Sequence, residues 1–220
     1  MNTMKSQPRF IRILLWSALV ILTVNILESA IHRGMIVAKG VVSSRNVFDR
    51  RYVEHPVVSF LHIAPGALFL MLAPLQFSVR IRTRSLQFHR WSGRLLVLTA
   101  MVTGLSAFVV GLPSFGGPVE SSARVVFGAL FLVAIIRAFV AIRQRDAPRH
   151  REWMIRAFAV AIGVSTVRVV ALVLVAFTGF SEFQKVFGLT FWLGWILTLG
   201  AAELWIRRTR LVSAQSRRAA

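Results

Sequence analysis

Six long hydrophobic stretches, separated by short polar connections, dominate the pattern of this 220-residue chain. Each stretch has about 20 residues or slightly more, the length that an α-helix needs to cross a hydrocarbon core about 30 Å thick. In lipid only helices and closed barrels satisfy their backbone hydrogen bonds, and barrel strands are about half as long. The pattern predicts an all-α integral membrane protein, a six-transmembrane-helix bundle. The predicted spans are Phe10–Ala30, Pro56–Val79, Trp91–Val110, Ala123–Ile142, Trp153–Phe177 and Phe187–Ile206.

Arginine residues alternate between these connections. The N-terminal tail, the second and fourth connections and the segment after the last span are rich in arginine, whereas the third connection has no Lys or Arg and the fifth has only Lys185. Cytoplasmic connections of membrane proteins carry the excess of Lys and Arg, so both termini are predicted to be cytoplasmic. The connection from Arg33 to His55 is an exception, because it carries five basic residues on the predicted outer side.

The predicted spans divide the chain into four parts. Residues 1–33 form a cytoplasmic tail and the first transmembrane helix, 34–55 an extracytoplasmic loop, 56–206 a five-helix core and 207–220 a basic cytoplasmic tail. The first span has the basic start and apolar core of a signal peptide. However, Leu27–Ala30 lacks the small residue expected at position −3 of a cleavage site, which favours an uncleaved anchor.

Composition and charge narrow the class of protein further. The chain is 56% hydrophobic, and its mean hydropathy is +0.67, which leaves no room for a separate soluble domain. The net charge of +19 would suggest nucleic acid in a soluble protein, but here the arginines lie at span ends. We therefore expect contacts with anionic lipid headgroups and no nucleic-acid binding. The absence of cysteine excludes disulfides and iron–sulfur clusters.

Three costly polar side chains fall at similar depth in the predicted outer half of the bundle. Arg168 lies fifteen residues, or roughly 22 Å, from the cytoplasmic start of its span, and His62 lies roughly 9 Å below the outer edge. Glu28 lies near the outer end of the first span. Charged groups inside spans are functional candidates, so these residues are predicted to converge, with Glu28 paired to Arg168. The alternative is a structural polar cluster, with His62 hydrogen-bonded to a helix backbone.

A second layer of candidates lies at the cytoplasmic starts of two spans. His89 and His150 each stand beside arginines, among them Arg94 and Arg156. One interpretation is a b-type haem held between the two imidazoles, with the arginines on its propionates. The other is an interfacial belt of Arg, His and Trp that contacts lipid phosphates. No metal-ligand set and no catalytic residue is assigned.

Four segments resemble the bacterial membrane proteins grouped as domain of unknown function 2306. The similarity covers roughly Pro56 to Glu203 and implies a multi-pass protein of the bacterial inner membrane, without an established activity. It also implies that His62, His89, His150 and Arg168 matter beyond this one sequence. Histidines in two layers of a helical bundle are similar, at the level of the fold alone, to those of di-haem cytochromes b. The segments that carry the resemblance are His62–Gly66, Leu72–Phe77, His89–Leu95 and His150–Arg156.

Three functions agree with these features. The first is electron transfer through haem or quinone bound between helices at His62, His89, His150, Arg94, Arg156 and Arg168. The second is a small-solute transporter or proton relay. The third is a noncatalytic partner of a membrane complex. A protein partner or a homo-oligomer agrees with the sequence as well. Whether the protein is an enzyme stays open, although missing motifs argue against an ATPase, a zinc protease and a Ser-His-Asp hydrolase.

The orientation can be tested with reporter fusions. Because arginine is concentrated on one side, fusions after Arg84, Pro148 and Ala220 should all report the cytoplasm, and a fusion near Gly117 should report the opposite side. A C-terminus outside the cytoplasm would overturn this orientation.

Overall fold

The computed structural model describes residues 9–41, 47–112 and 116–218. Within these ranges the regular secondary structure is entirely helical, as predicted. The helices are α1 (Arg9–Lys39), α2 (Val47–Glu54), α3 (Pro56–Phe77), α4 (Val79–Arg84), α5 (Leu86–Gly111), α6 (Gly117–Arg143), α7 (Ala147–Thr178) and α8 (Phe180–Arg218).

Six of these helices are long and apolar enough to cross a membrane, which confirms the predicted number of spans. Their bounds differ from the prediction in several places. Helix α1 continues nine residues past Ala30, and the segment predicted as an outer loop also contains α2. The segment around Lys185 that was predicted as a connection is helical, because α7 ends at Thr178 and α8 already begins at Phe180. The turn between them is Gly179, whose φ of 76° lies in the left-handed region that glycine tolerates.

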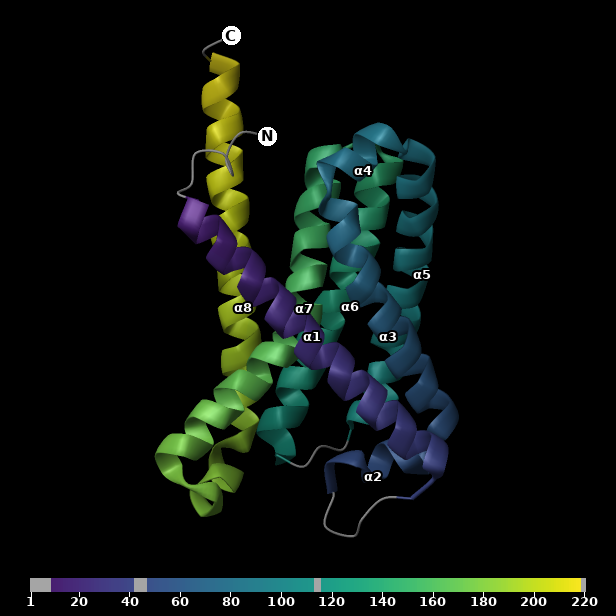
Figure 1. Ribbon diagram of the computed structural model, residues 1–220, viewed down its shortest axis with the longest axis vertical. Helices are drawn as coiled ribbons and strands as arrows, with labels where there is room; N and C mark the ends of the chain where they lie inside the picture. Colours follow the sequence, from purple (N-terminus) through teal and green to yellow (C-terminus); the bar gives the residue numbers. More distant parts are fainter. Residues whose placement is uncertain (1–8, 42–46, 113–115, 219–220) are drawn as a thin grey trace.

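The described parts of the chain alternate between the two ends of the bundle (Figure 1). Helix α1 begins and helix α8 ends toward the end of the bundle that carries α4, and α2 lies at the opposite end with the turn between α7 and α8. We call these the α4 end and the α2 end. The six spans therefore return the chain to the side on which it starts.

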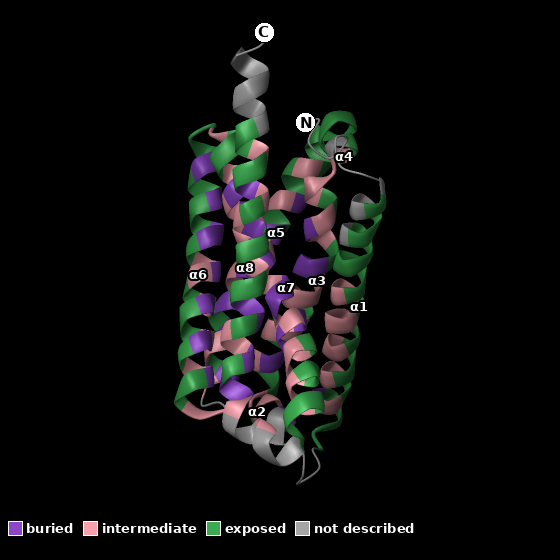
Figure 2. Ribbon diagram, turned by 90° about the vertical axis from the view of Figure 1, so that its left-hand side faces the viewer, coloured by how far each residue is buried: buried purple, intermediate pink, exposed green. Residues whose placement is uncertain are grey.

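Five helices form a closely packed bundle, and α1 lies diagonally across one of its faces (Figure 1). Helix α1 contacts α3, α7 and α2. Buried residues lie on the parts of the helices that face the inside of the bundle, and exposed residues lie on the parts that face outward (Figure 2). Its core includes Phe69, Leu96, Ala100, Ile135 and Ala157.

Small residues set the distance between α7 and α8. A Cβ atom built on Gly194 of α8 would lie only 2.6 Å from the backbone nitrogen of Val167 on α7. Lipid tails are as apolar as leucine, so helices in a membrane associate through this kind of close packing and through polar contacts. At the α4 end the same two helices are joined by ion pairs, Arg156 with Glu203 at 2.5 Å and Arg210 with Glu152.

Candidate functional site

A cavity of about 440 Å³ lies inside the α2 end of the bundle. Residues of all six spans and of α2 line it, so the cavity exists only once the whole bundle is assembled. Its volume is in the range of pockets that hold small organic ligands. Most of its wall is hydrophobic, including Phe69, Leu70, Phe131, Val160 and Trp195.

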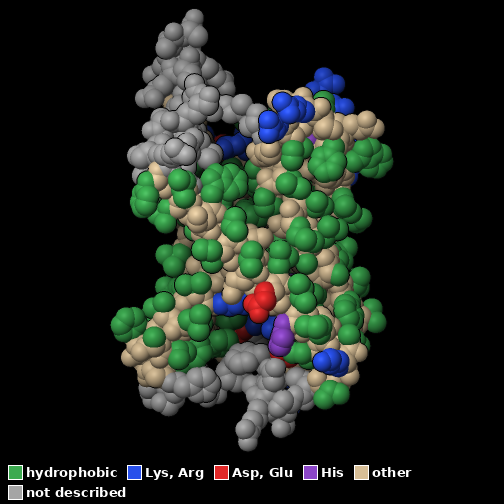
Figure 3. All heavy atoms as spheres, in the orientation of Figure 1, with side chains coloured by type: hydrophobic (Ala, Val, Ile, Leu, Met, Phe, Trp, Pro, Cys, Tyr) green, Lys and Arg blue, Asp and Glu red, His purple; other side chains and the backbone are tan. Residues whose placement is uncertain are grey.

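Polar side chains from several helices meet in this cavity. Its arginines come from α1, α2, α6 and α7, and His62 and Tyr52 come from α3 and α2. The face of the molecule that α1 crosses is mainly hydrophobic, but basic, acidic and histidine side chains show between the hydrophobic ones toward the α2 end (Figure 3). The four arginines are Arg33, Arg51, Arg124 and Arg168.

Arg33 and Arg124 each have a carboxylate partner. The Nε atom of Arg33 lies 2.6 Å from Oδ1 of Asp49, and its guanidinium lies 4.4 Å from the centre of the Tyr52 ring. Arg124 forms an ion pair with Glu120, one turn earlier in α6, whose side chain is fully buried. These two carboxylates balance two of the four positive charges.

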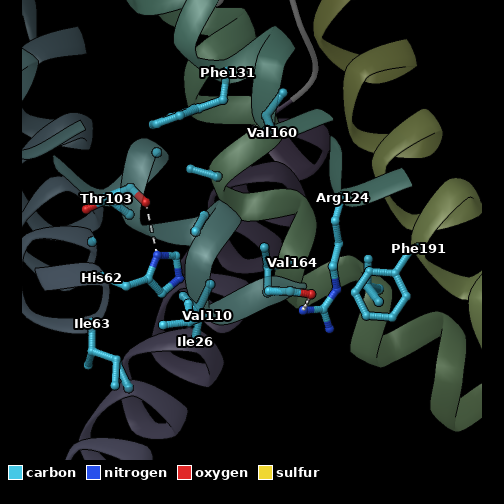
Figure 4. Close-up of a pocket in the computed structure, with 18 of the residues that line it drawn as sticks. Ile26, His62, Ile63, Thr103, Val110, Arg124, Phe131, Val160, Val164 and Phe191 are labelled. Atoms are coloured by element: carbon cyan, nitrogen blue, oxygen red, sulfur yellow. Dashed lines mark hydrogen bonds between the residues drawn. The ribbon is translucent and has the colours of Figure 1, made fainter. Parts of the chain in front are cut away.

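Further contacts hold the Arg124 side chain in place. It donates a hydrogen bond of 3.0 Å to the carbonyl oxygen of Gly111, and its guanidinium lies 4.9 Å from the centre of the Phe191 ring (Figure 4). Glu120 also accepts a hydrogen bond of 2.5 Å from the backbone N–H of Gly116. Glu120 thereby links Gly116, the residue before α6, to Arg124.

Arg51 and Arg168 have no carboxylate partner within the described residues. Arg51 donates from Nε to the carbonyl oxygen of Val109 at 3.1 Å. Arg168 donates to the hydroxyl of Ser29 and to the carbonyl oxygen of Asn25 on α1. Neutral acceptors satisfy some of their N–H groups but do not cancel their charge.

His62 is fixed in one orientation by the backbone of α5. Its Nδ1 atom lies 3.0 Å from the carbonyl oxygen of Thr103 (Figure 4). A carbonyl oxygen only accepts hydrogen bonds, so Nδ1 carries the proton and Nε2 of the neutral ring is left as an acceptor or ligand atom. The Tyr52 ring lies 6.4 Å away, between centroids.

The structure brings together two of the three residues predicted for the outer layer. His62 and Arg168 line the same cavity. Glu28 is exposed and does not line it, and the expected ion pair of Glu28 with Arg168 is not formed in the described structure. Helix α1 turns Asn25, Ser29 and Arg33 toward the bundle, which leaves Glu28 outside.

The residues predicted for the second layer lie at the α4 end. His89 on α5 and His150 on α7 are close enough to interact electrostatically, although the backbones of α5 and α7 are not in contact over the described residues. His150 donates from Nδ1 to the carbonyl oxygen of Ala138 at 2.9 Å. Arg156 pairs with Glu203, and the exposed Arg94 lies over the Trp91 ring. A haem role for these residues stays a prediction.

Several lining residues were not expected from the sequence. The connection from Arg33 to His55 contains three of them, Arg33, Arg51 and Tyr52. Its basic residues on the predicted outer side, which the charge rule does not explain, were the sequence feature that pointed to this segment. Arg124 lies one residue inside its predicted span, where it resembles an ordinary end-of-span charge. No group of three metal-ligating side chains occurs in the described ranges.

Fold and site together define a six-span membrane protein with an internal cavity whose polar lining is cationic. Residues 59–206, about two thirds of the chain, match the family described as Predicted membrane protein (DUF2306). The chain therefore belongs to this family, as the four sequence segments predicted. No curated protein and no solved structure matches the chain.

The ion pair of Arg124 and Glu120 should matter for stability. Glu120→Gln keeps the shape of the side chain but leaves Arg124 without a counter-charge, which should lower the free energy of unfolding by about 3 kcal/mol. Thermal unfolding of the detergent-solubilised protein measures this loss. The matched control is Glu54→Gln in α2, which is exposed and should change stability by less than about 0.5 kcal/mol. Equal effects of the two substitutions would contradict a structural role for the pair.

Proposed function

We propose that this protein binds an amphipathic anion within the membrane, with the anionic head group among the cavity arginines and the apolar part against the hydrophobic wall. The observation that carries the proposal is the convergence of four arginines and His62 in a cavity that is otherwise lined by apolar side chains. Such a site matches a molecule that has both a charged and an apolar part.

The charge of the cavity favours an anion over a neutral or cationic ligand. Asp49 and Glu120 form ion pairs with two of the arginines, whereas Arg51 and Arg168 have no carboxylate at ion-pair distance in the described structure. A charged side chain deep in a membrane span costs roughly 2.5–3.5 kcal/mol on insertion scales, and a bound anion offsets that cost. A quinone carries no charge and would leave both arginines unbalanced.

The remainder of the wall favours an apolar ligand body. Phe69, Phe131, Val160 and Trp195 lie deeper in the bundle than the arginines and bring side chains from α3, α6, α7 and α8 to the cavity. Burying apolar ligand surface against them contributes roughly 25 cal/mol per Å². A hydrocarbon chain or ring system is thus favoured over a small hydrophilic anion.

The packing beyond the cavity favours binding over an open channel. Toward the α4 end, Leu96, Ile135, Ala138 and Met154 are buried in the core of the same bundle. Transport would require these helices to separate, whereas capture and presentation of a ligand from the α2 side would not. The proposed function is therefore that of a membrane-embedded binding protein.

Ligand binding can be measured on the purified protein by native mass spectrometry with compounds that share a twelve-carbon chain. Laurate and dodecyl phosphate should bind at least about tenfold more tightly than dodecanol or dodecyltrimethylammonium, since hydrogen bonds to charged groups contribute about 1.5–3 kcal/mol. The double variant Arg51→Gln/Arg168→Gln should lose this preference. Arg137→Gln is the matched control, because Arg137 is exposed on α6 and does not line the cavity. Equal affinity for all four compounds would refute the proposal.

A second candidate is electron transfer through a b-type haem bound at His62. The supporting observation is that Nδ1 of His62 donates to a backbone carbonyl, an arrangement typical of imidazoles whose Nε2 binds a metal. The cavity arginines would then face the propionates.

An absorption spectrum of protein expressed with ample haem tests this candidate. If haem binds at His62, the unaltered protein should show a haem absorption spectrum, and His62→Ala should abolish it. His150→Ala is the matched control, because His150 makes the same Nδ1 contact at the α4 end, outside the cavity. A colourless protein would refute haem binding, and loss of the spectrum in His150→Ala alone would place the haem in the other layer.

A further inference from the structure

We infer that the anionic head group bound in this cavity is a phosphate monoester, which carries two negative charges at neutral to alkaline pH. The inference rests on the proposed binding of an amphipathic anion and specifies its chemical class. It follows from the number of unbalanced charges, from the donors that those charges present, and from the apolar wall.

Two of the four cavity arginines, Arg51 and Arg168, have no carboxylate at ion-pair distance in the described structure, although Glu28 and Asp49 attract Arg168 from farther away. Arg33 is paired with Asp49, and Arg124 with Glu120. Arg51 and Arg168 line the same cavity and contact only neutral acceptors in the described structure. A carboxylate or a phosphate diester, with one charge, would neutralise one of them and leave the other. A phosphate monoester neutralises both.

The placement of these two arginines also suits a phosphate. They come from different helices, Arg51 from α2 and Arg168 from α7, and both line the cavity. A guanidinium presents five N–H donors in a planar fork that matches phosphate oxygens, and a monoester offers three terminal oxygens. The contacts to Val109, Ser29 and Asn25 hold the side chains in place while leaving other N–H groups of each fork for a ligand.

Neighbouring groups complete this site. Arg33 is close enough to Arg168 to interact electrostatically, and it stacks on Tyr52, which lies beside His62. Nε2 of His62 can accept a hydrogen bond from a protonated phosphate or, as imidazolium, donate one to a phosphate oxygen. His62 thus accommodates the head group in either protonation state.

The phosphate could be carried by a lipid or by a water-soluble ester, and the hydrophobic wall favours the lipid. A soluble ester would place its polar remainder against Phe69, Phe131 and Trp195, where hydroxyl groups would lose hydrogen bonds to water. An acyl or isoprenoid chain fits the same wall without that cost. A comparison of ligands that share only the phosphate head group with ligands that share only the hydrocarbon chain distinguishes a lipid from a water-soluble ester.

The test compares lauroyl lysophosphatidic acid, a phosphate monoester, with lauroyl lysophosphatidylglycerol, laurate and glycerol 3-phosphate. Binding to the full-length protein is measured by native mass spectrometry at pH 8, where the monoester is doubly charged, because its second pKa is about 6. The monoester lipid should bind at least about tenfold more tightly than either singly charged amphiphile. Glycerol 3-phosphate should bind at least about a hundredfold more weakly than the monoester lipid.

Single substitutions identify the groups responsible. Arg51→Gln and Arg168→Gln should each lower the affinity for the monoester lipid at least about tenfold, and should lower the affinity for laurate by a smaller factor because the other arginine can still hold a single charge. A cooperative thermal unfolding transition shows that each variant is folded. Arg50→Gln is the matched control, since Arg50 is exposed on α2 and does not line the cavity.

Each outcome decides between stated alternatives. Equal affinity for monoester, diester and laurate would overturn the phosphate assignment and leave the proposed function intact. Binding of none of the three amphiphiles would refute the proposed function itself. Glycerol 3-phosphate binding as tightly as the lipid would support the phosphate head group and assign it to a soluble ester.

Discussion

The cost of holding guanidinium groups inside a membrane-spanning bundle is the constraint on which the α2 end of this protein depends. A lone arginine in such a place is unfavourable by several kcal/mol unless an anion, a hydrogen-bond acceptor or water stabilises it. Here Glu120 and Asp49 provide the counter-charges for two arginines, and backbone and hydroxyl oxygens hold the other two. These contacts join α2 to α1 and α5, α7 to α1, and Gly116 to α6.

The same constraint explains how the first helix is attached. Most of the surface of α1 is exposed apolar side chains, which gain nothing from packing when lipid is the alternative. Its contacts with α7 are polar: Ser165 donates to the carbonyl oxygen of Leu22 at 2.6 Å, and Arg168 donates to Ser29. Hydrogen bonds inside an apolar bundle are costly to leave unmade, so these contacts fix the rotation of α1 and direct Arg33 toward the cavity.

The fold could be predicted from the sequence because membrane thickness fixes the length of a hydrophobic span and backbone hydrogen bonding requires a helix. Helix ends were less predictable: α1 continues past Ala30 and through Gly34 to Lys39, after which Gly40 adopts a φ of 65°. For the site, depth along a span correctly grouped His62 with Arg168. Depth says nothing about rotation around the helix axis, so Glu28 was grouped with them although it faces outward. Arg124 was missed because a charge near a span end is equally consistent with headgroup contact.

An anion in the cavity would do more than occupy space. Arg168 reaches α1 through Ser29, and Arg51 reaches α5 through Val109, so a group held between the two arginines would link α2, α7, α1 and α5. A ligand that binds only the folded state stabilises that state by mass action. Here the stabilisation would be greatest at α1 and α2, where packing contributes least. On this proposal, the α2 end is more stable with a ligand than without one, and ligand binding is coupled to the order of that end of the bundle.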